Sequence, residues 1–316
     1  MATLPLQLKC KSNTANDVFN ILGDFVQPTS STTPAAIAES IDRLKPSLPG
    51  NDLESFLWET WVVFITVAEQ IPHDHCSQDR LVEVIDALTQ LPSTTVQIWG
   101  SDICVWKDLP LLGATMRESW RGPTPDNSYA VQEDAEKCVN LNSFAARLLK
   151  LDSISWFNFA IWTLRSALEQ NPPEAELGTY VNAAAEWIKY SGKVLFDMAE
   201  ASGGENEDRI LSAGALYLGP SKLCLERWAF WKQRLNRISE VPGQIGSCCS
   251  YLFINKSDQD QSTNSRLDAY QANRNTVLTQ EIDQHLVNPT AQVFPDLQVL
   301  RSISYDIKTY AAYQVL

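Results

Sequence analysis

The sequence lacks the short motifs that identify most enzyme classes. It has no Gly-x-Gly-x-x-Gly or Gly-x-x-x-x-Gly-Lys-Ser/Thr phosphate loop, no Gly-x-Ser-x-Gly nucleophile turn and no His-Glu-x-x-His motif. Only three His occur in 316 residues, which argues strongly against a histidine-rich metal site. We therefore expect a protein with no metal and no organic cofactor.

Paired cysteines, long apolar runs and excess positive charge are also missing. The seven Cys include no Cys-x-x-Cys pair, as expected of a reduced, cytoplasmic protein. The longest strongly apolar run, residues 61–68, is far shorter than the roughly 20 residues of a membrane span. Residues 1–13 have no continuous apolar core of a secretory signal. The net charge of −13 gives no general affinity for nucleic acid.

What the sequence does contain is helical periodicity. Apolar residues recur at helical spacing along most of the chain, and Pro or Gly breaks separate the periodic segments. The expected helices cover residues 13–26, 34–45, 51–71, 77–91, 109–120, 127–151, 156–169, 174–201, 208–218, 221–239 and 277–287. Residues 94–105, rich in β-branched and aromatic side chains, predict either a short strand or an extended link.

This pattern predicts an all-α fold, a single multi-helix bundle of about ten antiparallel helices that is weakly solenoidal. The helix pairs share no fixed period, so tetratricopeptide and ankyrin arrays are not supported. Residues 1–241 form the expected helical domain. Residues 242–316 lose the helical period and form a divergent, partly irregular segment that packs on the domain or trails from it.

Tryptophan pairs are the most informative feature. Trp58 and Trp61, and likewise Trp228 and Trp231, are three residues apart, so both indoles of a pair lie on roughly one helix face. Each pair either fills a core or lines an aromatic pocket. Together with Trp120, these side chains are the predicted substrate-binding residues.

Three arginines beside these aromatic residues are the candidate catalytic groups. Arg117 precedes Trp120, Arg147 interrupts an apolar helix face, and Arg227 is four residues from Trp231. A guanidinium group could polarise a bound substrate next to an aromatic wall. The alternatives are an internal ion pair or cation–π packing.

The segment 51–59 matches the Asn/Asp-Asp-Leu-x-Ser-x-x-x-Glu pattern and resembles the second metal motif of class I terpene cyclases. Asn51, Ser55 and Glu59 fall on one helix face and could hold Mg²⁺ through oxygen ligands. The upstream Asp-rich partner motif is absent. The alternative is that Asn51 caps the helix and Glu54 completes a capping box.

Residues 71–76, Ile-Pro-His-Asp-His-Cys, combine two imidazoles, a carboxylate and a thiol. These are zinc ligands in principle, but their spacing fits no established zinc site. The segment joins two predicted helices, so capping of the second helix by Asp74, His75 or Ser77 is the simpler interpretation.

Several phrases together resemble a known family. They are Trp58-x-x-Trp61, Ile71-Pro72, Gln78-Asp79-Arg80-Leu81, Asp108-Leu109-Pro110, Arg117-Glu118-x-Trp120, Asn142-x-Phe144-Ala145-Ala146-Arg147-Leu148 and Glu226-Arg227-Trp228-x-Phe230-Trp231-Lys232. Over about residues 15–240 they are similar to a fungal family of uncharacterised proteins, domain of unknown function 3632. The resemblance implies a soluble fungal protein and, by association, a role in specialised metabolism.

The first functional hypothesis is a cofactor-independent enzyme that acts on an apolar small molecule, with cyclisation or cycloaddition as the reaction. Such reactions need a shaped pocket and one or two hydrogen-bond donors. A non-catalytic helical protein-interaction module and an atypical Mg-dependent class I terpene cyclase are the alternatives. The expected partner is an apolar substrate, and a homodimer is compatible with the pattern.

Overall fold

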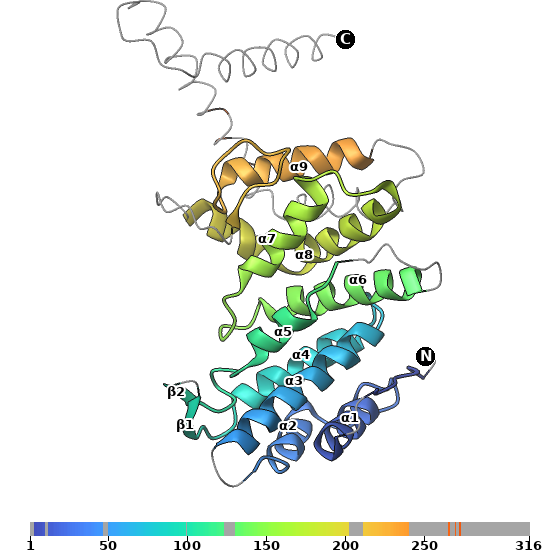
Figure 1. Ribbon diagram of the computed structural model, residues 1–316, viewed down its shortest axis with the longest axis vertical. Coiled ribbons are helices and arrows are strands. Elements are labelled where there is room, and N and C mark those ends of the chain that lie inside the picture. Colours follow the sequence, from blue (N-terminus) through green and yellow to red (C-terminus); the bar gives the residue numbers. More distant parts are fainter. Residues whose placement is uncertain are drawn as a thin grey trace, which may run out of the picture. The chain divides into compact units, whose positions relative to one another are not determined.

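The computed structural model describes residues 3–9, 12–46, 50–98, 100–122, 130–201 and 211–239, and three further positions at 265, 269 and 272. The chain divides into two compact units, Met1–Asn264 and Ser265–Leu316. Within the described residues the first unit holds nine helices and one two-stranded hairpin (Figure 1). The predicted all-α class is confirmed.

The first four helices follow the predicted periodicity closely. They are α1 Asn13–Phe25, α2 Pro34–Asp42, α3 Asn51–Gln70 and α4 Ser77–Thr89. The Thr33 hydroxyl accepts the Ala36 N–H at the start of α2 and so caps this helix. The cap of α3 differs from the prediction, because Gly50 occupies that position and makes no side-chain bond.

The ambiguous segment 94–105 contains a hairpin. Strands β1 Thr95–Ile98 and β2 Ser101–Cys104 pair antiparallel, with Thr95 opposite Cys104. Gly100 turns the chain between them at a φ of 80°, a conformation that glycine adopts without steric cost. The strand alternative of the sequence analysis is therefore the correct one.

A strained connection leads from the hairpin into α5 Leu112–Ser119. Trp106, Leu109 and Leu111 all have positive φ, which costs free energy in residues with large side chains. Trp61 of α3 donates its indole N–H to the carbonyl oxygen of Pro110 over 2.6 Å. This buried bond holds the connection, and hence the start of α5, against α3.

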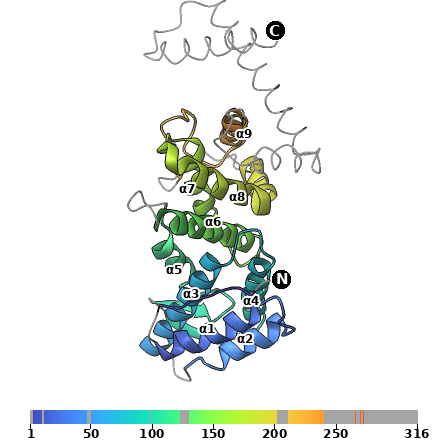
Figure 2. The ribbon, with the colours of Figure 1, turned by 90° about the vertical axis from the view of Figure 1, so that its right-hand side faces the viewer.

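The remaining helices are α6 Ala130–Leu148, α7 Phe157–Leu168, α8 Glu174–Ala201 and α9 Leu225–Ser239. Helix α6 packs against α3 and α4 and also against α8, which in turn contacts α7 and α9 (Figures 1 and 2). Helix α6 therefore joins the first four helices to the last three. In the described part of the chain, no helix has the length and apolarity to cross a membrane.

One predicted helix is wrong over its described part. Residues 212–218 are not helical, although a helix was expected over 208–218. The backbone N–H groups of Gly214 and Leu216 donate to the side chain and the carbonyl oxygen of Glu169. These long-range bonds replace the local ones of a helix. The expected helix at 277–287 lies outside the described residues, as does nearly all of the predicted segment 242–316.

Candidate functional site

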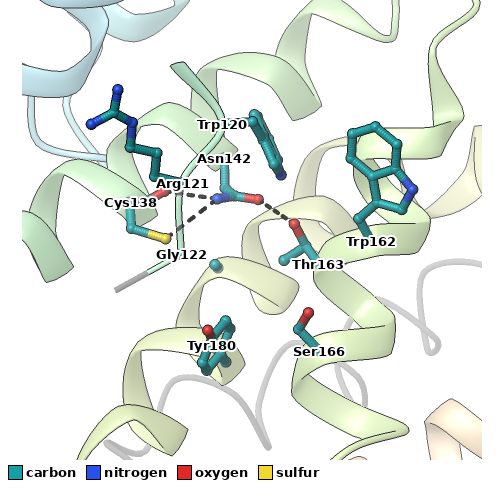
Figure 3. Close-up of a pocket in the computed structure, with 10 residues that line it drawn as sticks. Trp120, Arg121, Gly122, Cys138, Asn142, Trp162, Thr163, Ser166 and Tyr180 are labelled. Carbon is teal, nitrogen blue, oxygen red and sulfur yellow. Dashed lines mark hydrogen bonds between the residues drawn. The ribbon is translucent and has the colours of Figure 1, made fainter. Parts of the chain in front are cut away.

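A pocket of about 150 Å³ lies among α6, α7, α8 and the segment that follows α5 (Figure 3). Its lining residues are Trp120, Arg121, Gly122, Cys138, Asn142, Trp162, Thr163, Ser166, Tyr180 and Ala183. A protein cavity of this volume accommodates a molecule about as large as benzene. The pocket is therefore matched to one ring of a ligand.

The Asn142 side chain fixes the polar side of the pocket. Its Oδ1 accepts the Thr163 hydroxyl over 2.7 Å and the Trp187 indole N–H over 2.8 Å. Its Nδ2 donates to the Cys138 carbonyl oxygen over 2.8 Å. Because the amide is buried and fully paired, it holds α6, α7 and α8 in one arrangement.

Aromatic side chains form the walls. Trp120 packs against Phe159 with ring centroids 4.6 Å apart and lies 6.3 Å from Trp187, so its position is fixed by two neighbours. Tyr180 lies close against Gly122, where an added Cβ would come within 2.7 Å of the phenol oxygen. The glycine thus leaves the room that the Tyr180 hydroxyl occupies.

The thiol and the phenol that line the pocket are both neutral at physiological pH. Burial, together with the nearby Glu69 carboxylate, raises the pKa of the Cys138 thiol to about 11. Burial also raises the pKa of Tyr180, helped by Glu176 and Cys138. Cys138 is therefore a poor nucleophile, whereas Tyr180 keeps its proton and can donate a hydrogen bond.

Two hydroxyl groups of the pocket remain available to a ligand. Neither Ser166 nor Tyr180 hydrogen-bonds through its side chain to another residue in the part of the chain that the structure describes. Among the described residues that line the pocket, only Arg121 carries a formal charge, and Figure 3 shows its guanidinium group directed away from Trp162 and Ser166. The arrangement suits an uncharged ligand that accepts or donates hydrogen bonds.

The structure places the predicted catalytic Arg227 in a sealed cluster outside the lining of the pocket. Its Nε and Nη2 donate to both oxygens of Glu169, over 2.6 and 3.0 Å, and neither side chain is exposed. Trp231 donates to the same carboxylate over 2.7 Å, and Gly214 does so over 2.8 Å. We call these four residues the Glu169 cluster; its guanidinium group is occupied by structural contacts.

Arg147 and Arg117 also lie outside the pocket lining. Arg147 is 2% exposed and pairs with Asp79 over 2.8 Å. Its guanidinium lies over the Tyr190 ring, 3.6 Å from the ring centroid. Arg117 is exposed in the last turn of α5. The structure therefore does not bring the three predicted arginines together.

The predicted tryptophans divide in the same way. Trp120 lines the pocket. Trp61 is fully buried in the core, whereas Trp58 is partly exposed. Trp228 and Trp231 pack against each other in a T-shaped pair with centroids 6.0 Å apart. Both helical pairs thus contribute to packing rather than to the described pocket.

The two segments considered for metal binding make other contacts. Ser55 is exposed, and the Glu59 carboxylate accepts the Ser12 hydroxyl over 2.6 Å; the Asn51 side chain lies outside the described residues. The His75 Nδ1 accepts the Ser77 N–H at the start of α4, in line with the capping interpretation. Among the described residues, no three His, Cys, Asp or Glu side chains are placed to hold one metal ion.

Sequence reasoning missed most of the pocket. Asn142 belongs to one of the phrases that resemble the family, but the sequence analysis assigns no binding role to Trp162, Ser166 or Tyr180. A partial signal was available, since Trp162 and Ser166 are four residues apart on one face of α7. Nothing local to Tyr180 indicates that it closes against Gly122.

The chain is thus an all-α protein with a small aromatic pocket between its helices. A family model described as protein of unknown function (DUF3632) matches residues 61–235, which is more than half of the chain. The protein belongs to this family. Comparison with curated proteins and with solved structures gives no match.

Proposed function

We propose that the pocket binds a ring-sized part of an uncharged, apolar small molecule. We further propose that the protein is a cofactor-independent enzyme that promotes cyclisation or cycloaddition of that molecule. The supporting observation is the pairing of aromatic walls, Trp120 and Trp162, with two protonated hydroxyl donors, Ser166 and Tyr180. A fungal origin, a cytoplasmic location and a role in specialised metabolism belong to the same proposal.

The chemistry follows from this arrangement. A hydroxyl that donates to a substrate carbonyl withdraws electron density and lowers the barrier to bond formation. The indole faces hold a planar reactant in a productive conformation and stabilise developing positive charge. In this proposal Tyr180 replaces the predicted arginines as the polarising donor, because those guanidinium groups lie outside the pocket lining.

The binding step is tested with the full chain by NMR titration with phenol, cyclohexanone and benzoate. The two neutral rings should bind, and benzoate should not, because its carboxylate would lose hydration while the Arg121 guanidinium group is directed away from Trp162 and Ser166 (Figure 3). Tyr180→Phe should weaken phenol binding about fivefold, the usual worth of one neutral hydrogen bond. Tyr190→Phe removes a hydroxyl from the same helix outside the pocket lining and serves as the control.

A second variant tests the location. Ser166→Leu places a larger side chain in the pocket and should abolish phenol binding. Unchanged binding by this variant would move the ligand elsewhere. The reaction itself is tested by metabolite profiling of a host that carries the neighbouring biosynthetic genes: a product of unchanged mass that requires this protein supports a cyclase.

A non-catalytic interaction module is the second candidate. The observation that favours it is the burial of Trp61, Trp228 and Trp231, since in such a protein the tryptophan pairs form the core. The pocket is also smaller than the several hundred Å³ typical of drug-sized ligand sites. Unchanged metabolite profiles together with no binding of neutral rings would support this candidate over the enzyme.

A further inference from the structure

A cluster of polar side chains joins the connection between α3 and α4 to α6 and α8. The imidazole Nδ1 of His73 lies 3.1 Å from Oε1 of Glu186. The His73 carbonyl oxygen accepts Nη2 of Arg147 over 3.0 Å, and Ser143 Oγ lies 2.9 Å from it. Ser143 Oγ is also 2.5 Å from Oε2 of Glu186. We call these four residues the His73 cluster.

The cluster is not a nucleophile with its general base. In a serine triad the hydroxyl donates to the Nε2 of histidine, and the carboxylate holds Nδ1. Here the Ser143 hydroxyl contacts the carboxylate of Glu186 and a backbone oxygen instead. Ser143 is fully buried, so a substrate could not reach it. The role of the cluster therefore depends on the charges of His73 and Glu186 rather than on a nucleophilic hydroxyl.

The Glu186 side chain is 4% exposed and the His73 side chain 44% exposed. A buried carboxylate needs charged or hydrogen-bonded partners. Lys189 of α8 supplies a distant one, with Nζ 4.0 Å from Oε1. Protonated His73 supplies the closest cation, from a segment that is 113 positions away in the sequence. Water reaches His73, so its proton can exchange while Glu186 stays inside.

The other charged groups at the cluster are few. Asp74 from the connection adds negative charge near His73, and Lys189 adds positive charge. Asp79 of α4 pairs with Arg147, whose guanidinium group also donates to the His73 carbonyl oxygen. The hydrogen bond that His73 donates to Glu186 is the largest cause of the raised pKa of His73. The charges of Glu186 and Asp74 also raise this pKa, whereas burial and Lys189 lower it.

We propose that the charge state of His73 controls how firmly the connection between α3 and α4 is held to α8. With the imidazole protonated, a charge-assisted bond to Glu186 fastens the connection. Once the proton is lost, Glu186 loses its closest cation, and a bond from the neutral imidazole is no longer charge-assisted. The connection then depends mainly on the bonds that Arg147 and Ser143 of α6 make to the His73 carbonyl oxygen and on the bond from Gln78 of α4 to Ile71. The contact is thus a pH-sensitive link between the first four helices and α8.

The direction of the pH effect follows from linkage. The pKa of His73 is raised in the folded protein above its ordinary value of 6.5. The contribution to stability is therefore fully present below about pH 6.5, where the unfolded chain is protonated too. It is lost as the pH rises through the raised pKa of the folded state.

The experiment combines two readouts on the full chain. The chain has three His, so the imidazole signal of His73 can be assigned with His73→Gln and followed by NMR as a function of pH. It should titrate above 6.5 in the wild type and lower in Glu186→Gln. His75→Gln, which alters the neighbouring imidazole, should leave the His73 titration unchanged.

The second readout is urea unfolding of wild type, His73→Gln, Glu186→Gln and the double variant at pH 6 and pH 8.5. The coupling energy between the two substitutions should be clearly smaller at pH 8.5 than at pH 6. Titration of wild-type His73 at or below 6.5, or additivity at both pH values, would overturn the proposal. If Glu186→Gln does not fold, Glu186→Asp, which withdraws the carboxylate by one methylene, replaces it in both readouts.

Discussion

Two buried glutamates organise different parts of the molecule in different ways. Glu169, at the end of α7, has no exposed surface, and its carboxylate is paired with Arg227, which is equally buried. Glu186, in α8, is also buried, but its closest cation is the half-exposed His73. The first carboxylate is sealed, whereas the second touches a group that exchanges protons with water.

The same kind of buried charge thus serves two purposes in this protein. An arginine keeps its charge at any physiological pH and offers two parallel donors, so the Glu169 cluster is permanent. A histidine changes its charge near neutrality, so the His73 cluster responds to pH. Substitutions at the two clusters should therefore differ both in size and in pH dependence.

The largest effect is expected at the sealed cluster. Glu169→Ala leaves the Arg227 guanidinium buried without its counter-charge and should lower the free energy of unfolding by about 3–5 kcal/mol. Urea denaturation at pH 7 measures the loss. Glu39→Ala, which removes an exposed partner of Arg43, is the control and should change stability by less than about 0.5 kcal/mol. If Glu169→Ala lowered stability no more than the control Glu39→Ala, Glu169 would not be the residue that holds its cluster together.

A smaller loss of stability is expected when a side chain is added to the Glu169 cluster instead of removed from it. A Cβ at Gly214 would lie 2.5 Å from the carbonyl oxygen of Glu169. Backbone must then move, so Gly214→Ala should cost about 1–3 kcal/mol. Gly23→Ala in α1 meets nothing within 4 Å and should stabilise by about 0.5–1 kcal/mol. Equal thermal shifts for the two variants would contradict this difference.

At the His73 cluster, Ser143→Ala removes a buried hydroxyl that contacts Glu186 and Arg147. Both partners keep other bonds, so the expected loss is about 1–2 kcal/mol, less than for Glu169→Ala. Chemical denaturation provides the measurement. Ser40→Ala, in the partly exposed α2 helix, should stay within about 0.5 kcal/mol of wild type. If Ser143→Ala lowered stability as much as Glu169→Ala, the two clusters would not differ in their contribution to stability.

The smallest effect is the pH dependence itself. His73 is half-exposed, so water screens its pair with Glu186, and the contribution should be about 0.2–1 kcal/mol at pH 6. The destabilisation caused by His73→Gln should shrink between pH 6 and pH 8.5, whereas that caused by Glu169→Ala should stay constant. Urea unfolding curves at both pH values measure this difference. The same change with pH in both variants would contradict the prediction.

The helices could be predicted from the sequence because their signal is local. The expected helix at 174–201 coincides with α8 Glu174–Ala201, and the one at 51–71 exceeds α3 Asn51–Gln70 by one residue. The failure at 212–218 has a non-local cause, since its backbone bonds go to Glu169, more than 40 positions earlier. Periodicity contains no information on such a partner.

The candidate site was predicted less well for the same reason. Trp120 could be predicted as a pocket residue from its neighbours in the sequence. The role of Arg227, in contrast, depends on Glu169, which is 58 positions away. An arginine next to a tryptophan resembles a binding site as long as the sequence does not reveal the buried carboxylate with which it pairs. Ser166 and Tyr180 become a pair only when α7 and α8 pack together.

The two indoles in the pocket wall have a practical consequence. Trp120 and Trp162 are two of ten Trp in the chain, and a ring that enters the pocket must displace water from both. Indole fluorescence depends on that local polarity, so occupancy should change the protein's own emission without any label. Trp120→Phe and Trp162→Phe would subtract the signal one indole at a time. The pocket thus carries an intrinsic optical reporter with which libraries of uncharged compounds can be screened for the unknown ligand.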